Sequence, residues 1–101
     1  MSKRIGTFTI AQGARESNVL NIENSDITSL SLFTNALAET VKLYASPTGS
    51  TGWRPVKSDG EDVVLPANSC ITLTKAPWLA IKLVAGGNAA EARKISVTGG
   101  N

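Results

Sequence analysis

Histidine is absent from this chain, and cysteine occurs once among its 101 residues. Histidine is the commonest general base, proton shuttle and metal ligand in proteins, so its absence removes most catalytic and metal sites from consideration. A single cysteine forms neither an intramolecular disulfide nor a cysteine-rich zinc site. Cys70 stands at the entry to an expected strand, and we expect it to be a small buried hydrophobic residue, because free cysteine is among the most buried residue types. A catalytic thiolate would need a histidine or another basic group beside it.

Charge is also scarce: 10 Lys and Arg residues against 8 Asp and Glu residues leave a net charge of +2. The basic residues are dispersed, and no aromatic residues interleave with them, so we expect no nucleic-acid binding. No apolar run approaches the roughly 20 residues that cross a bilayer, so we expect no membrane insertion. Residues 5–10 alternate apolar residues with Thr and Gly and do not resemble the apolar segment of a signal peptide. We therefore expect the chain to fold in a reducing cytoplasm.

The remaining chemistry-bearing residues form no recognisable catalytic set. Asp59, Glu61 and Asp62 cluster in one turn, but they lack the ligand ladder of a calcium loop and are expected to be solvated. Gly86 and Gly87 are not followed by the Lys-Ser/Thr of a phosphate-binding loop. The other carboxylates fall singly, so no acid–base pair is indicated. The sequence therefore predicts no catalytic residue, no metal ligand and no cofactor, and a protein that is not an enzyme.

Hydrophobic residues make up 42% of the chain, and they recur with a period of two, which is typical of half-buried strands. In residues 5–10, for example, Phe8 and Ile10 share one face and Thr7 and Thr9 share the other. Strands are expected over residues 5–10, 18–22, 27–33, 41–45, 53–56, 63–65, 71–74, 78–84 and 93–98. Turn chemistry separates them at 23–26, 47–52, 58–61 and 66–69.

Turns at roughly 8–12-residue spacing and about eight short strands predict an all-β chain, a single antiparallel β-sandwich of jelly-roll or Ig-like type. Helix is expected to be limited to one turn at residues 35–40. One domain is expected over residues 1–101, because a chain of this length has room for one core. A short basic N-terminal arm, residues 1–4, is expected to precede it.

The two tryptophans are the informative aromatic residues. Trp78 has the opposite parity to Leu79, Ile81 and Leu83, so either face of its strand could be the core. Trp78 is then a residue at the rim of the core or lies on a surface that a neighbouring subunit covers. Trp53 follows a Gly-rich hairpin tip and either packs against Tyr44 across the hairpin or forms a binding platform for a sugar or a protein partner.

Several stretches of the C-terminal 60 residues or so are similar to a known class of protein. They are TVKLYAS (40–46), the glycines at 49 and 52, WRPV (53–56), LPA (65–67), PWLAI (77–81) and AAEARKISVTG (89–99). Together they resemble small β-sandwich virion proteins of tailed bacteriophages. The most specific element is the closing AEAR strand entry, since the hairpin with Ser, Gly and Trp also occurs in sugar-binding sandwiches.

The resemblance implies a non-enzymatic structural subunit of the virion, a capsid decoration or cement protein that is assembled in the host cytoplasm. The implied partners are the major capsid protein or another virion protein, together with further copies of the chain, a trimer among the possibilities. The alternatives are a carbohydrate-binding or adhesion module and a tail or neck component. The residues expected at partner contacts are Lys3, Arg4, Pro47, Trp53, Arg54 and Trp78.

Overall fold

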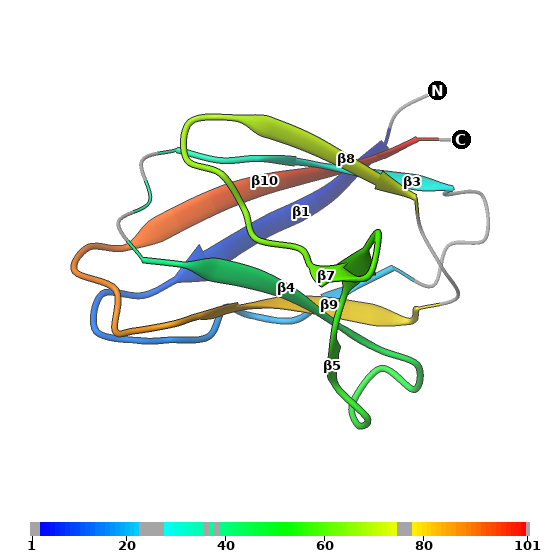
Figure 1. Ribbon diagram of the computed structural model, residues 1–101, viewed down its shortest axis with the longest axis horizontal. Coiled ribbons are helices and arrows are strands. Elements are labelled where there is room, and N and C mark those ends of the chain that lie inside the picture. The colour runs from blue at the N-terminus through cyan, green and yellow to red at the C-terminus, as the bar shows by residue number, and fades with distance from the viewer. Residues whose placement is uncertain (1–2, 23–27, 36, 38, 75–77, 101) are drawn as a thin grey trace.

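Alternation of apolar and polar residues produces strands throughout the chain (Figure 1). The computed structural model describes all residues except 1–2, 23–27, 36, 38, 75–77 and 101. The strands are β1 (Lys3–Ile10), β2 (Leu20–Asn21), β3 (Ser29–Phe33), β4 (Val41–Ser46), β5 (Arg54–Pro55), β6 (Lys57–Ser58), β7 (Glu61–Asp62), β8 (Cys70–Thr74), β9 (Ala80–Ala85) and β10 (Arg93–Gly100). The described residues contain no helix, and so none long and apolar enough to span a membrane.

Two antiparallel four-stranded sheets have the strand orders β1-β10-β3-β8 and β2-β9-β4-β5, and β6 pairs with β7 in a third, two-stranded sheet. The two larger sheets lie one above the other in Figure 1. The prediction of an all-β chain with antiparallel sheets is confirmed. The expected number of strands was too low, because residues 58–61 were interpreted as a plain turn and instead close the β6–β7 hairpin.

Side chains from both large sheets meet in one hydrophobic cluster. Phe8, Leu30 and Val97 come from the first sheet, Leu43 and Ile81 come from the second, and all five are fully buried. Their positions follow the predicted alternation, since residues two apart in a strand point to the same face. Burial of apolar surface contributes about 25 cal/mol per Å², so this cluster is the main source of stability.

Some local boundaries differ from the sequence-based expectation. Residues 63–65 form no strand ladder: the amide of Leu65 donates to the carbonyl of Val41 at 2.9 Å, and Val64 forms an isolated bridge with Lys42. This segment follows β4 beyond the end of β5 without becoming a full strand. The strand expected from residue 78 begins at Ala80.

The helical turn expected at residues 35–40 is not present in residues 35, 37, 39 and 40, and residues 36 and 38 lie outside the described part of the chain. A helix this short has no stability of its own, because nucleation is costly. The turn expected at 23–26 lies outside the described residues.

Cys70 is exposed, so the prediction that it is buried was wrong. The alternation in β8 directs Ile71 and Leu73 inward, where they pack against the core cluster. Cys70 has the opposite parity and pairs with Phe33, which is also exposed. The parity of β8 therefore outweighs the general burial preference of cysteine.

Candidate functional site

The structure separates the six predicted contact residues into two groups. Lys3 and Arg4 belong to β1 and pair with Gly99 and Thr98 of β10. The expectation of a free basic arm over residues 1–4 is therefore wrong for Lys3 and Arg4, because their backbone completes a sheet edge. Residues 1 and 2 lie outside the described part of the chain.

The other predicted residues gather around β5, where two adjoining hollows form what we call the flank groove. The first hollow, of about 340 Å³, is lined by Ala45, Pro47, Gly52, Arg54, Pro55, Val56, Lys57 and Trp78. The second, of about 230 Å³, is lined by Val56, Lys57, Ser58, Thr72, Leu73, Thr74 and Trp78. The flank groove thus runs from the hairpin tip after β4 to β8, an edge strand of the other sheet.

Trp78 and Val56 form the apolar centre of the flank groove, since both hollows share them. Trp78 is half-buried and packs against the core cluster, which places it at the rim of the core. Arg54 and Lys57 are exposed on the groove wall, and the Lys57 ammonium is ion-paired with Asp62, so the positive charge of the wall comes mainly from Arg54. An apolar floor with a polar rim is the usual composition of a protein-binding surface.

Trp53 is half-buried and is not one of the residues that line the flank groove. The centroid of its ring lies 4.7 Å from the ammonium nitrogen of Lys82. Lys82 pairs with Tyr44 across β9 and β4, and its Nζ lies 2.8 Å from Glu16 Oε1. The ring contact that the structure gives Trp53 is with Lys82, whose strand partner is Tyr44. The cation–π contact holds the indole against the outer face of the second sheet.

The hairpin tip at residues 46–52 is organised by two hydroxyl groups, the buried Ser46 Oγ and the Thr48 Oγ1 that accepts from the Thr51 amide at 3.0 Å. Ser46 Oγ accepts hydrogen bonds from the amides of Gly49 at 2.9 Å and Thr48 at 3.3 Å, and donates to the carbonyl of Thr51. Ser46 is fully buried. Because these bonds replace backbone pairing within the tip, they give the wall of the flank groove a defined shape.

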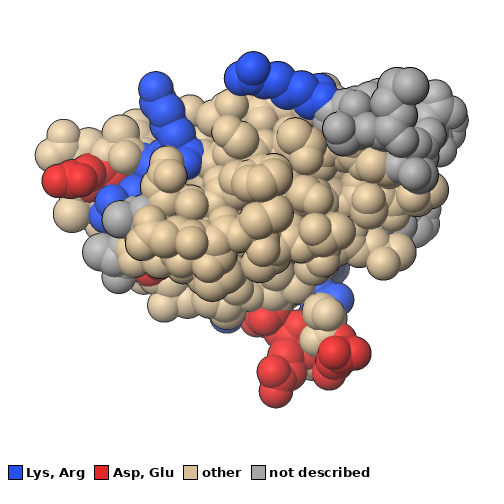
Figure 2. All heavy atoms as spheres, turned by 90° about the horizontal axis from the view of Figure 1, so that it is seen from above, with Lys and Arg blue, Asp and Glu red and all other residues tan. Residues whose placement is uncertain are grey.

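A projecting hairpin, β6–β7, borders the groove. Asp59 and Gly60 form its two-residue turn with φ angles of 54° and 83°, as a tight hairpin turn with positive φ at both positions requires. Figure 2 shows acidic side chains gathered on a projection at one side of the molecule, at the place of this hairpin. Asp62 Oδ1 lies 2.9 Å from Lys57 Nζ, and Asp62 Oδ2 lies 3.0 Å from Lys42 Nζ. Hydrogen bonds from these two lysines hold the pKa of Asp62 below its usual value.

The predicted acidic turn is thus a charged hairpin whose Asp62 is engaged by two lysines. No group of three His, Cys, Asp or Glu side chains suited to a metal ion occurs among the residues that the structure describes. Ser58, at the base of this hairpin, lines the second hollow of the flank groove.

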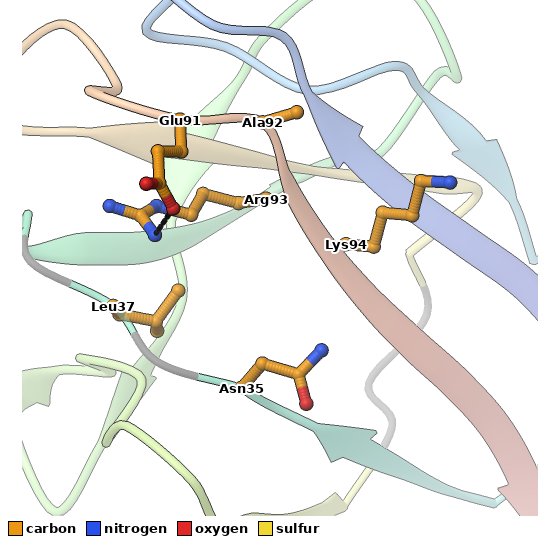
Figure 3. A pocket seen from close by; sticks show the side chains of 6 residues that line it. All are labelled: Asn35, Leu37, Glu91, Ala92, Arg93 and Lys94. Carbon is orange, nitrogen blue, oxygen red and sulfur yellow. Dashed lines mark ion pairs between the residues drawn. The ribbon is translucent and has the colours of Figure 1, made fainter.

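A third hollow, of about 290 Å³, lies where β10 begins and is lined by Asn35, Leu37, Glu91, Ala92, Arg93 and Lys94 (Figure 3). Figure 3 shows the Arg93 guanidinium turned toward Glu91, with Lys94 pointing the other way. Arg93 also lies 3.1 Å from Glu39 Oε2, and the two side chains are only 10% and 9% exposed. This ion pair links Glu39 to the first residue of β10 and contributes to the stability of the fold.

The Glu39 carboxylate predicts a pH dependence of stability. Burial raises the pKa of Glu39, but hydrogen bonds from its own backbone amide, from Arg93 and from the Ala90 amide lower it more, so the net pKa lies below 4.5. A folded-state pKa below the unfolded value contributes stability above about pH 4.5 that is lost as pH falls through the folded pKa. Urea unfolding is expected to show stability falling as the pH drops below about 4.5.

The variant Glu39→Gln should show a shallower loss over this range, although Asp62 still contributes to the remaining slope. Glu91→Gln is the matched control, because Glu91 is 82% exposed and lies 3.9 Å from Arg93. Equal slopes for Glu39→Gln and the wild type would contradict this role of Glu39.

Sequence reasoning missed Lys82, Val56 and Lys57. Lys82 has the same parity as Trp78, but the pattern left open which face of that strand is the core and did not show which ring Lys82 would contact. Val56 and Lys57 follow Pro55 at the edge of the second sheet, and their place in the flank groove depends on β8, which is remote in sequence.

Comparison with known proteins gives the fold. The sequence matches no protein-family model and no curated protein sequence. Among solved structures, the SPBc2 prophage-derived protein YomS is similar with a TM-score of 0.62 and 13% identity, over 98% of this chain and 94% of that one. A protein of Bacillus endospore appendages, described as disulfide-linked pili, has a TM-score of 0.56 and 16% identity over 97% and 83%.

The Yersinia pseudotuberculosis-derived mitogen is similar with a TM-score of 0.55 and 14% identity, over 98% of this chain and 84% of that one. Identities this low establish a shared small β-rich fold and no shared site. The similarity covers nearly the whole chain, whereas the resemblance in the sequence covered about its C-terminal 60 residues.

Proposed function

We propose that this chain is a non-enzymatic structural protein of a tailed-phage virion, a β-sandwich that decorates the head and stabilises its shell. The observation that carries the proposal is the flank groove. It joins an apolar centre of Trp78 and Val56 to a charged wall that carries Arg54 and the Lys57–Asp62 ion pair. This composition suits protein binding.

The fold supports the phage assignment. The chain shares its fold over 98% of its length with a prophage-derived protein. A shared fold does not by itself carry function, so the groove and the virion-protein resemblance of the C-terminal segments carry the rest. A decoration protein needs a rigid frame and a contact surface, and two four-stranded sheets with a common core provide the frame.

The partner in this proposal is the major capsid protein or another virion protein, and the protein acts in the virion. Copies on a shell repeat one contact around local symmetry axes, which favours a homo-oligomer such as a trimer. Many weak contacts then add through multivalency. The contact residues in the proposal are Pro47, Arg54 and Trp78 in the flank groove, with Trp53 beside it.

A carbohydrate-binding or adhesion module is the second candidate, and a tail or neck component is a variant of the first. Trp53 is the residue that a sugar would stack on. Its ring already has the Lys82 ammonium 4.7 Å from the centroid, so one ring face is occupied and the other remains for a sugar. The Trp53 contact therefore does not separate the two candidates, and it is the apolar flank groove that favours a protein partner.

The proposal is tested with undecorated heads of the phage that encodes the protein. Wild-type protein is expected to bind saturably and to raise the temperature at which the heads disrupt. Arg54→Glu reverses a charge on the groove wall. It is expected to weaken binding by about tenfold or more, because the partner surface that faces Arg54 in this proposal is acidic and would repel the new carboxylate. Trp53→Ala is expected to weaken binding less, since its ring faces Lys82.

Lys94→Glu is the matched control for Arg54→Glu. Lys94 is exposed on β10, in the other sheet, so this charge reversal should leave binding unchanged. Circular dichroism confirms that each variant is folded. Absence of binding by the wild type, together with glycan binding that Trp53→Ala abolishes, would replace the proposal with the adhesion function.

A further inference from the structure

The four edge strands of the two large sheets are β1, β8, β2 and β5. Edge strands present unpaired backbone groups, and proteins protect them with short length, proline, bulges or charge. β2 and β5 have two residues each, and β5 contains Arg54 and Pro55. β1 carries Lys3 and Arg4 and an irregularity in its register between Arg4 and Gly6.

The edge of β1 is also covered by a side chain. Asn18 Nδ2 donates to the carbonyl of Thr7 at 3.2 Å, and Asn18 Oδ1 accepts from the amide of Thr9 at 2.7 Å. The Asn18 amide group thus takes the place of a neighbouring strand. Three of the four edges therefore carry a recognisable protective feature.

β8 has none of these features. Its five residues, Cys-Ile-Thr-Leu-Thr, include no charged residue and no proline, and its pairing with β3 is regular from Ser29↔Thr74 to Phe33↔Cys70. β3 is its only strand neighbour in the described part of the chain. β8 is therefore the one edge among them that is regular, unprotected and long enough to pair.

The hydrogen-bond phase shows which backbone groups of β8 are available. The amide of Thr34 donates to the carbonyl of Ser69 at 2.8 Å, so this pair is bonded across the ladder. Residues alternate between bonded and non-bonded pairs in an antiparallel ladder. The N–H and C=O groups of Cys70, Thr72 and Thr74 consequently point away from β3 toward the open side.

The opposite end of the sheet gives the same phase independently. The Thr7 carbonyl and the Thr9 amide are directed to Asn18. The backbone groups of Phe8, which lies between them, therefore face Ile95 of β10. Following the register through β10 and β3 to β8 again leaves the groups of Cys70, Thr72 and Thr74 outward. Two separate hydrogen-bond sets thus agree on the open donors and acceptors.

The hollow beside this edge provides room for side chains of an added strand. The β8 residues Thr72, Leu73 and Thr74 form one wall, and Val56 and Trp78 are part of the lining. Ser58, at the base of the acidic hairpin, lies on the same hollow. Asp59 and Glu61 are exposed, and neither has an ion-pair partner within the residues that the structure describes.

We propose that β8 is a strand-addition site that binds an extended segment of a partner protein antiparallel to residues 70–74. The segment alternates apolar residues, which point into the hollow beside Leu73 and Trp78, with polar ones, and carries a lysine or arginine toward Asp59 and Glu61. Main-chain hydrogen bonds supply affinity and the hollow supplies specificity. This deepens the proposed function by naming how the virion partner is held.

A second copy of this chain fits the edge less well. A two-fold axis through an antiparallel β8–β8 pair would place both acidic hairpins on the same side of the joined sheet. Like charges facing each other across such an interface are unfavourable. Charge therefore favours a slender basic segment over a second β8.

The test selects binders from a display library of random dodecapeptides and synthesises the enriched sequences. The enriched peptides should alternate apolar and polar residues and contain Lys or Arg. Hydrogen exchange of the wild-type protein should show new protection at the amides of Cys70, Thr72 and Thr74 when such a peptide binds. Alternate amides of an added strand point toward β8 and away from it. N-methylation of the peptide amides that face β8 should abolish binding, whereas N-methylation of the intervening amides should leave binding unchanged.

Two variants of Thr72 complement the peptide series. Thr72→Pro removes one outward amide that is not needed by β3, and it should weaken binding by about tenfold or more. Thr72→Val keeps the amide and the shape, so it should bind as the wild type does. If Thr72→Pro does not fold, the N-methylated peptides still decide the question on unaltered protein.

Several results would overturn this inference: no enriched peptides, protection confined to other strands, insensitivity to N-methylation, or self-association of the protein through β8. Head binding separates the inference from the proposed function. If heads bind wild-type and Thr72→Pro protein equally, strand addition fails and the decoration function stands. If peptides pair with β8 but the protein does not bind heads, the decoration function fails and the strand-addition site stands.

Discussion

Replacing Phe8 with alanine is expected to remove about 3–5 kcal/mol from the free energy of unfolding, the usual cost of truncating a buried aromatic residue. Phe8 is fully buried in the cluster shared by the two large sheets. The substitution loses its buried apolar area and leaves a cavity that the neighbouring core residues fill only in part. A small domain has about 5–15 kcal/mol in total, so the variant is expected to be largely unstable at 37 °C.

The chain contains its own control for this experiment, since it has two phenylalanines. Phe33 is 47% exposed on the outer face of β3, and Phe33→Ala is expected to change stability by about 0.5 kcal/mol or less. Urea unfolding followed by tryptophan fluorescence measures both variants. Similar losses for the two would show that the core is not where the two-sheet arrangement places it.

Replacing Ser46 with alanine is expected to have the second-largest effect on stability. Ser46 Oγ accepts from the amides of Thr48 and Gly49 and donates to the carbonyl of Thr51. Its loss removes three partly buried hydrogen bonds, although the Thr51 carbonyl keeps the Thr48 hydroxyl as a donor. At about 0.5–1.5 kcal/mol per bond, the expected loss is about 1–3 kcal/mol. For a domain of about 100 residues, each kcal/mol shifts the melting temperature by roughly 4–8 °C.

Ser50→Ala is the matched control, because Ser50 is an exposed serine of the same tip. It should melt within about 2–4 °C of the wild type, the shift that corresponds to half a kcal/mol. The Ser46→Ala variant should also bind heads more weakly than its stability alone explains, because the tip forms one wall of the flank groove. An unchanged melting temperature would contradict the assigned role of Ser46.

The strand pattern was predictable because burial acts on each residue locally. The period of two in β1, β3, β4 and β10 shows directly which side chains face a core. The same parity argument, applied to β8, would have placed Cys70 outside with Thr72 and Thr74. The burial preference of cysteine was given too much weight there. The turn at Asp59 and Gly60 was also predictable, although its flanking residues pair more than expected.

The candidate site was predictable only in part. Pro47, Arg54 and Trp78 were identified from residue type and their place in turns and strand entries, and the structure gathers them in the flank groove. Lys3 and Arg4 look like a free arm when only local sequence is considered. Their pairing with β10 joins residues more than 90 positions apart, and no local pattern contains that information.

By itself the sequence determined an all-β chain, the inward face of most strands, the main turns and the absence of histidine chemistry. Each of these follows from residue type and short-range alternation. Only the tertiary structure decided which strands are neighbours, and therefore which edges are open and which hollows form between them. The physical reason is that strand pairing and sheet packing join residues distant in sequence, and the backbone hydrogen bonds that select a neighbour are the same for every residue type except proline.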